Sequence, residues 1–259
     1  MGIEIFQKHI REKRAVKVVA GESNFDLENV AKIARAAQRG KASAIDVACR
    51  KDVIETARKN SKLPIFASSI HPFEILEAVK SGVDAIEIGT YESAYKKGYT
   101  YTYSQIYDII LETFGLINNY DVYKCVTIPM CLNSSDRIKL LAELEILGVD
   151  LVQTEGFKMI DPKNHVFVKD ANASINKAVE VIRNSRIPVV STCSMDEKTA
   201  QYAFSQGVDG VSIGSFVKKQ DTEIAMASKI TEIVSNISHR NSLNREIVRN
   251  ATELKFLKF

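Results

Sequence analysis

The chain has 259 residues, of which 45% are hydrophobic, and a formal net charge of +3 at neutral pH. This length is sufficient for one large α/β domain, and so small a basic excess gives no clear signal for nucleic-acid binding. No apolar run approaches the roughly 20 residues of a membrane-spanning helix, so we expect no membrane partner.

The first half of the chain alternates predicted strands with predicted helices. Residues 3–14 form a short amphipathic helix, and a strand follows over Ala15–Ala20. Asp26 is a suitable N-cap for a helix over Leu27–Arg39. The next predicted elements are strand Ala44–Ala48, helix Lys51–Asn60, strand Pro64–Ser68, a helix from Pro72 to Lys80, and strand Asp84–Gly89.

The second half continues the alternation with two unusual segments. Tyr91, Tyr95 and Tyr99 recur every four residues, which predicts one packed face of a helical turn. Residues 157–172 are interpreted as a long polar connection, and such connections often form lids or binding loops. The other predicted elements are helix Ser104–Ile117, strand Val122–Ile128, helix Ser135–Leu147, a strand ending at residues 154–156, helix Ala173–Asn184, strand Pro188–Thr192, a helix ending at Gln206, a strand after Gly207, and helix Asp221–Val234.

Two sequence repeats interleave along these elements. Gly-Val-Asp occurs at residues 82–84, 148–150 and 207–209, each time between a helix and a strand, and two other strands begin with Pro64 and Pro188. Two strand–helix units per repeat of roughly 60 residues predict eight units in all. Eight units close most simply into a single parallel (β/α)8 barrel, a TIM barrel, over residues 1–234. An open doubly wound sheet is the alternative, although no GxGxxG motif follows the first strand.

Residues 235–259 form a basic tail in which apolar residues recur at helical spacing. This pattern predicts a C-terminal helical extension that packs on the barrel or on another subunit of a homo-oligomer, rather than one that contacts a polyanion. The apolar positions are Leu243, Ile247, Ala251 and Leu254.

Polar residues are predicted inside the barrel, where valine, isoleucine and leucine are usual. Aligning the Gly-Val-Asp copies superposes Glu87, Gln153 and Ser212, and Asp46 joins them if one inserted residue is allowed. Lys17 on the first strand would lie among the acidic groups. One interpretation is an internal salt-bridge network. The other is that Lys17 is a nucleophile or base with a lowered pKa, while Asp46 or Glu87 transfers protons.

The carboxyl ends of three strands carry candidate binding residues. Thr192 and Ser194 follow the seventh strand, and Gly214 and Ser215 follow the eighth. The loops at these two places are a common phosphate site in barrels of this type, with ordinary turn chemistry as the alternative.

The sixth strand ends in Gln153, Thr154 and Glu155. We interpret Gln153 and Thr154 as substrate-binding residues. Glu155 is a general acid or base, or receives a substrate hydroxyl, unless it caps a neighbouring helix.

No metal site or cofactor follows from the sequence. The four histidines show no HxH or HExxH spacing. The cysteines show no CxxC spacing and are interpreted as reduced, buried thiols. They are Cys49, Cys125, Cys131 and Cys193.

As a set, these motifs resemble the family called hypothetical chloroplast open reading frame twenty-three, found in algal plastid genomes and cyanobacteria. The resemblance covers most of the chain, roughly residues 15–234, and implies a plastid-encoded stromal protein with an aldolase-type barrel, but no established activity. The segments that carry it are Ala15–Gly21 with Asn24–Asp26, Ile86–Gly89, Val152–Gly156 and Val211–Ser215.

Three functional hypotheses follow. The first is a lyase- or isomerase-like enzyme that acts on a small phosphorylated metabolite, by proton transfer or carbon–carbon bond chemistry at a carbonyl, with Lys17, Asp46, Glu87 and Glu155 as the reacting set. The second is a non-catalytic barrel that binds a phosphorylated ligand and reports on it to a partner. The third is a structural or assembly role. An open pocket above the charged cluster would favour the enzyme, and a plugged interior the binding protein.

Overall fold

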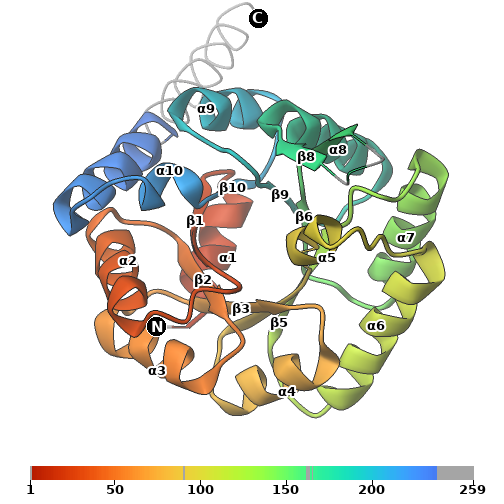
Figure 1. Ribbon diagram of the computed structural model, residues 1–259, viewed down its shortest axis with the longest axis horizontal. Helices are drawn as coiled ribbons and strands as arrows, with labels where there is room; N and C mark the ends of the chain where they lie inside the picture. The colour runs from red at the N-terminus through yellow and green to blue at the C-terminus, as the bar shows by residue number, and fades with distance from the viewer. Residues whose placement is uncertain (1, 90, 162–163, 165, 238–259) are drawn as a thin grey trace, which may run out of the picture.

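The computed structural model describes residues 2–89, 91–161, 164 and 166–237, and eight of its strands form a closed parallel barrel (Figure 1). This confirms the predicted (β/α)8 fold and excludes the open sheet. Around the barrel the strands run in the order β1, β2, β3, β4, β5, β6, β9 and β10. Their bounds are β1 Ala15–Gly21, β2 Ala44–Ala48, β3 Ile65–Ser69, β4 Ala85–Ile88, β5 Tyr123–Ile128, β6 Leu151–Thr154, β9 Val189–Ser191 and β10 Gly210–Ile213.

Most helices form a ring outside the strands, while α1 lies across one end of the barrel and the short helix α5 lies inside the ring, beside β5 and β6 (Figure 1). A further helix is described over residues 223–237, and the predicted tail beyond residue 237 lies outside the described residues. The bounds are α1 Glu4–Arg11, α2 Leu27–Arg39, α3 Lys51–Asn60, α4 Pro72–Lys80, α5 Glu92–Lys96, α6 Tyr103–Leu116, α7 Ser134–Ile146, α8 Ala171–Asn184, α9 Glu197–Ser205 and α10 Ser215–Lys218.

The Gly-Val-Asp repeat has a structural explanation. Gly82, Gly148 and Gly207 have φ angles of +80°, +69° and +97°, a left-handed conformation that ends the preceding helix at little steric cost for glycine. The aspartate two residues later then accepts a hydrogen bond of 2.8 Å from a backbone N–H of the neighbouring strand. The three acceptor–donor pairs are Asp84 with Ile65, Asp150 with Lys124, and Asp209 with Val189. Each repeat therefore ends one helix and fixes the next strand beside its neighbour.

The segment 157–172 differs from its predicted form. It contains an antiparallel hairpin of β7 (Phe157–Asp161) and β8 (Val166–Lys169), and α8 begins at Ala171 behind an Asp170 N-cap. The β-branched and aromatic residues of the two strands are a strand signal that the polar composition of the rest of the segment masks.

The tyrosine-rich segment differs in part. Tyr91 and Tyr95 are buried beside the short helix α5, whereas the side chain of Tyr99 is 66% exposed. The predicted common face therefore holds for two of the three tyrosines, because the helix ends at Lys96.

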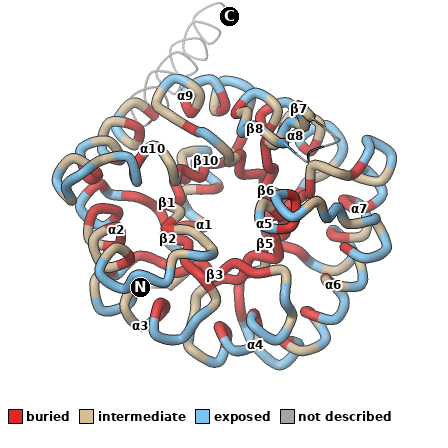
Figure 2. The backbone as a smooth tube through the Cα atoms, viewed as in Figure 1, coloured by how far each residue is buried: buried red, intermediate tan, exposed pale blue. Residues whose placement is uncertain are grey.

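Helix α1 closes the amino-terminal end of the barrel. Phe6 is fully buried and meets the rings of Phe66 and Tyr123 edge to face, at centroid distances of 4.9 and 6.0 Å. The strands that it covers are buried along most of their length (Figure 2). The amino-terminal end is thus packed with aromatic side chains, while the opposite end carries a cavity.

We predict that Phe6→Ala lowers the free energy of unfolding by about 3 to 5 kcal/mol, because it removes a fully buried ring and leaves a cavity among the aromatic side chains that close this end of the barrel. Urea unfolding followed by circular dichroism measures the change. Ile5→Ala on the same helix is the control, because Ile5 is 37% exposed, and it should change stability by less than about 1 kcal/mol. Equal losses of stability in the two variants would contradict the role of Phe6 in closing this end of the barrel.

Candidate functional site

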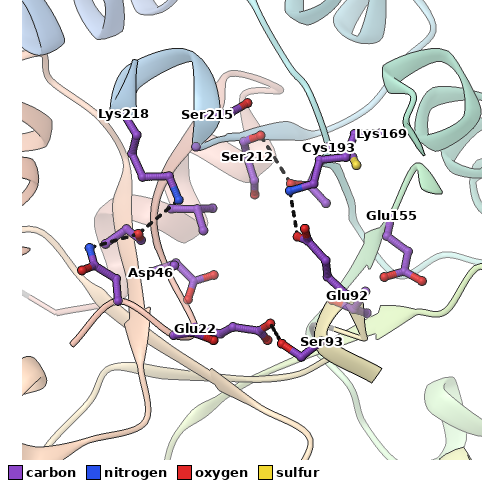
Figure 3. Close-up of a pocket in the computed structure, with 18 of the residues that line it drawn as sticks. Glu22, Asp46, Glu92, Ser93, Glu155, Lys169, Cys193, Ser212, Ser215 and Lys218 are labelled. Carbon is purple, nitrogen blue, oxygen red and sulfur yellow. Dashed lines mark hydrogen bonds and ion pairs between the residues drawn. The ribbon is translucent and has the colours of Figure 1, made fainter. Parts of the chain in front are cut away.

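A cavity of about 550 Å³ opens at the carboxyl ends of the strands (Figure 3). Most of the residues that line it are polar. The deep part consists of side chains that point into the barrel, and the mouth is formed by the loops after β1, β9 and β10, by α5 and by the β7–β8 hairpin. Of the predicted site residues, those in the lining are Asp46, Glu87, Gln153, Glu155, Thr192, Ser194, Gly214 and Ser215.

Beneath the cavity lies a fully buried ammonium group. Lys17 Nζ donates a hydrogen bond of 2.8 Å to Asp46 Oδ2 and forms a second, shorter ion pair with Glu87 Oε2. Ser68 Oγ donates to the other Asp46 oxygen over 2.6 Å. The three charged side chains are at most 4% exposed. Because each carboxylate also has a hydrogen-bond donor, the cluster is paired as buried charges require.

The same network continues to the far side of the barrel through Glu87 Oε1. This oxygen accepts hydrogen bonds from Thr127 Oγ1 at 2.9 Å and from Gln153 Nε2 at 2.5 Å. Ser212 Oγ in turn donates to Gln153 Oε1 at 2.8 Å. Side chains from seven of the eight barrel strands are therefore joined at one depth, as the alignment of Glu87, Gln153 and Ser212 predicted.

The pKa values of Lys17 and Glu87 both lie above their ordinary values. Burial alone would lower the pKa of Lys17, but Asp46 and Glu87 outweigh it and hold the pKa above its ordinary value. The expected lowered pKa is therefore wrong, and Lys17 lies outside the cavity lining. Burial raises the pKa of Glu87 to about 7, against the opposing effect of Lys17. Glu87 can thus exchange a proton near neutral pH while Lys17 stays charged.

Glu155 is a second buried carboxyl group on the cavity wall. Its Oε1 accepts hydrogen bonds of 2.5 Å from the Tyr95 hydroxyl and 2.6 Å from the Met130 backbone N–H. Burial raises the pKa of Glu155 to about 7, although both hydrogen bonds oppose the shift. The side chain accepts its backbone bond from a loop and caps no helix, so the alternative interpretation of Glu155 as a helix cap does not hold.

The rim of the cavity carries a lysine, Lys218, beside Gly214 and Ser215, and its side chain is exposed. Lys218 Nζ donates to the backbone oxygen of Ala20 at 3.3 Å, and among the described residues no carboxylate forms an ion pair with it. Partial burial lowers the pKa of Lys218, and the charge of Lys169 adds to that effect. An anion bound at this rim would offset both effects, because it would pair with the ammonium group.

The loop after β9 has an uncommon backbone. Cys193 and Ser194 have φ angles of +80° and +53°, a left-handed conformation that non-glycine residues rarely adopt. Consecutive residues in this conformation cost free energy and occur preferentially at ligand sites. Both residues and Thr192 line the cavity, and Cys193 lies on the same side of it as Glu155 (Figure 3).

Thr154 does not belong to the cavity. It follows Gln153 on β6, so its side chain points to the outer face, where Oγ1 bonds the backbone oxygen of Ser174 on α8 at 3.0 Å. The prediction that it binds substrate is corrected by this strand alternation. The cysteine prediction also needs correction, since all four are free thiols but only Cys125 is buried.

Several lining residues were not predicted as site residues. Thr127 lies two residues after Cys125 on β5, and inward alternation on that strand is a signal that would have found it. Tyr95 and Lys169 reach the site through α5 and the hairpin, whose placement depends on tertiary contacts. In α5, Ser93 donates to Glu22 at 2.7 Å, and Glu92 pairs with Lys169 (Figure 3).

The described residues contain neither a group of side chains suited to a metal ion nor a membrane-spanning helix. Within residues 2–89, 91–161, 164 and 166–237, no three His, Cys, Asp or Glu side chains gather in a group that could hold a metal ion. No helix in this described part is sufficiently long and apolar to cross a membrane.

Comparison with known proteins places the chain among relatives of unknown activity. Residues 3–243 match the family model described as "Protein of unknown function (DUF561)". "Uncharacterized protein ycf23" of Cyanidium caldarium is 34% identical over 232 residues, which are 87% of this chain and 92% of the relative.

Solved structures share the fold at low identity. 3-Hexulose-6-phosphate synthase from Salmonella typhimurium has a TM-score of 0.61 and 14% identity, over 86% of this chain and 99% of the other. (S)-3-O-geranylgeranylglyceryl phosphate synthase from Thermoplasma acidophilum, in complex with substrate sn-glycerol-1-phosphate, has a TM-score of 0.57 and 13% identity, over 90% and 98% of the two chains.

We predict that Lys17→Met lowers the free energy of unfolding by about 3 to 5 kcal/mol, because it leaves two buried carboxylates without their cation. Chemical denaturation at pH 8 measures the loss. Lys124→Met is the matched control, since this half-buried lysine of β5 forms no ion pair with a described carboxylate. A loss no larger for Lys17 than for Lys124 would refute the pairing.

Glu155 gives a pH-dependent prediction. Its pKa is about 4.5 in the unfolded chain and about 7 in the fold, so its favourable contribution to stability is present below pH 4.5 and lost as the pH rises through 7. Glu155→Gln keeps a neutral side chain at every pH. The free energy of unfolding of the variant, relative to the unaltered chain, should therefore rise by up to roughly 3 kcal/mol between pH 4.5 and 8. A difference that is constant across this range in urea titrations would contradict the raised pKa.

Proposed function

The chain belongs to the DUF561 family of proteins of unknown function. We propose that it binds a small phosphorylated metabolite in the barrel mouth and transfers a proton to and from the carbon atom beside a carbonyl group. One observation carries this proposal. Two buried carboxyl groups with pKa values near 7, Glu87 and Glu155, face the same cavity. A general acid or base is most effective when its pKa lies near the working pH.

The phosphate end of the ligand is assigned to the rim. Gly214 and Ser215 lie there beside Lys218, an ammonium group whose only described hydrogen-bond acceptor is a backbone oxygen. Thr192 and Ser194 supply hydroxyl groups from the neighbouring loop. One protein of the same fold is a 3-hexulose-6-phosphate synthase, and another was solved in complex with its substrate sn-glycerol-1-phosphate. Their likeness supports the phosphate and not a particular substrate.

The two carboxyl groups divide the proton transfer. The one that is ionised removes the proton from the carbon beside the carbonyl group, and the one that is protonated donates to the carbonyl oxygen. The resulting enediol returns one proton to carbon and gives one back from oxygen, so no proton is gained or lost. Asp46 accepts a hydrogen bond from a substrate hydroxyl group, since its oxygens retain free lone pairs after they accept the bonds from Lys17 and Ser68.

Lys17 positions the two carboxyl groups that it contacts and does not itself react with the substrate. Its ammonium group is enclosed by Asp46 and Glu87 and lies outside the cavity lining, so the imine chemistry of a nucleophilic lysine has no support. Its ammonium group pairs with Asp46 and fixes the orientation of Glu87.

A non-catalytic ligand-binding barrel is the second candidate. The observation that favours it is the complete internal pairing of the Lys17 network, which a purely structural network would also have. The open cavity above the network favours the enzyme instead. We extend the proposal to a plastid-encoded protein of the stroma, which the ycf23 name of its relatives supports in part.

Calorimetric titration with sugar phosphates and glycerol phosphates tests ligand binding. We expect at least one phosphorylated ligand to bind and Lys218→Gln to weaken its binding by about tenfold. The control Lys219→Gln, at a neighbouring position outside the cavity lining, should bind within twofold of the unaltered chain. If no phosphorylated compound binds, or if both variants lose affinity equally, the assigned phosphate site is wrong.

Proton transfer has a separate test. With a bound hydroxy-carbonyl ligand in heavy water, the chain should exchange a carbon-bound proton for deuterium, and Glu87→Gln and Glu155→Gln should each slow the exchange by at least about 100-fold. Binding without exchange in the unaltered chain would leave only the second candidate.

A further inference from the structure

We propose that Lys169, on the β7–β8 hairpin, is a second phosphate-binding cation, which leaves Glu92 and pairs with the ligand when a dianionic phosphate monoester occupies the mouth. This inference rests on the proposed phosphate site and names the ligand class that the site selects. Lys169 ends β8 within the segment that was interpreted from its sequence as a polar connection.

Lys169 is placed to reach a ligand at the rim. It lines the same cavity as Lys218, Ser194 and Ser215. In Figure 3 its side chain extends over the mouth from the hairpin toward Glu92, on the side where Cys193 lies. Its charge is felt by both neighbours, since it contributes to the lowered pKa of Lys218 and acts against the burial that raises the pKa of Cys193. Two ammonium groups therefore approach the rim from opposite elements, α10 and β8.

The present partner of Lys169 can release it at small cost. Glu92 pairs with Lys169 and with Lys96, each at 2.7 Å, so that loss of one lysine leaves the carboxylate paired with the other. The side chain of Lys169 is 43% exposed, and ion pairs at this level of exposure contribute little to stability. A phosphate dianion held beside Lys218 offers Lys169 twice the charge of a carboxylate.

The hairpin holds the lysine near the mouth during such an exchange. Phe157 of β7 and Phe167 of β8 both contact the ring of Tyr95, at centroid distances of 5.7 and 5.4 Å. The ammonium group of Lys169 also lies 5.7 Å from the centroid of the Phe157 ring. Only the side chain of Lys169 needs to move, because both strands stay packed on α5 through the aromatic contacts.

Two cations at the rim specify the charge of the ligand. Lys169 and Lys218 together neutralise a phosphate monoester in its dianionic form, whereas a phosphodiester or a carboxylate carries only one negative charge. Affinity for a monoester should therefore rise as the pH passes the second pKa of phosphate, near 6.

Calorimetric titration of the full chain with ribose 5-phosphate, inorganic phosphate and dimethyl phosphate tests the inference. We expect Lys169→Gln to weaken ribose 5-phosphate and inorganic phosphate by about tenfold, and to leave weak dimethyl phosphate binding unchanged. Lys96→Gln is the matched control, because Lys96 also lines the cavity and pairs with Glu92 but its side chain is 71% exposed, and it should change affinity by less than about threefold. Glu92→Gln frees Lys169 and should tighten binding of the monoester.

The outcomes separate the two proposals. If Lys169→Gln and Lys96→Gln weaken binding equally, Lys169 acts only through distant charge and the inference is overturned, while the phosphate site at Lys218 stands. If Glu92→Gln weakens binding, the exchange of partners is wrong. If the unaltered chain binds neither ribose 5-phosphate nor inorganic phosphate, the phosphate site itself fails, and the inference fails with it.

Discussion

A lysine ammonium group enclosed within a closed barrel sets the constraint on which the rest of the site depends. Lys17 cannot be buried without opposite charge, so Asp46 and Glu87 must lie within hydrogen-bond distance of it. These carboxylates in turn require donors, which Ser68, Thr127 and Gln153 supply from other strands. The strand register delivers this arrangement, because Lys17 pairs with Ser212 across β1 and β10, and Ser68 with Glu87 across β3 and β4. Polar side chains thus replace the usual aliphatic layer, and the cavity opens directly above them.

Much of this arrangement could be predicted from local sequence signals. The Gly-Val-Asp repeat predicted the barrel because each copy has a local function, a left-handed helix end followed by an aspartate that binds the next strand. The inward position of Glu87 and Gln153 followed from strand alternation relative to these glycines. The same alternation places Thr154 on the outer face, against its predicted role in substrate binding.

The remaining differences depend on distances that no local pattern contains. Burial and charge pairing shift the pKa of Lys17 in opposite directions, so the sign of the shift is decided by how closely two carboxylates approach. Tyr95 and Lys169 join the site only because the hairpin packs on α5 through aromatic contacts. Their sequence surroundings, a tyrosine-rich stretch and a polar segment, give no sign of this packing. The residues of the proposed phosphate rim, by contrast, were predicted from the position of their loops in the fold, and all four line the cavity.

The paired network of Lys17, Asp46 and Glu87 lies at the bottom of the cavity, and the proposed exchange of partners by Lys169 takes place at its mouth. The central claim is that two carboxyl groups in one cavity exchange protons near neutral pH above a permanently charged lysine. A ¹³C NMR titration of the glutamate side-chain carboxyl groups tests this most directly, with resonances assigned through Glu87→Gln and Glu155→Gln. The account predicts two resonances with midpoints near pH 7, one lost in each variant. Midpoints for all glutamates between about pH 3.5 and 5, the ordinary range, would contradict it.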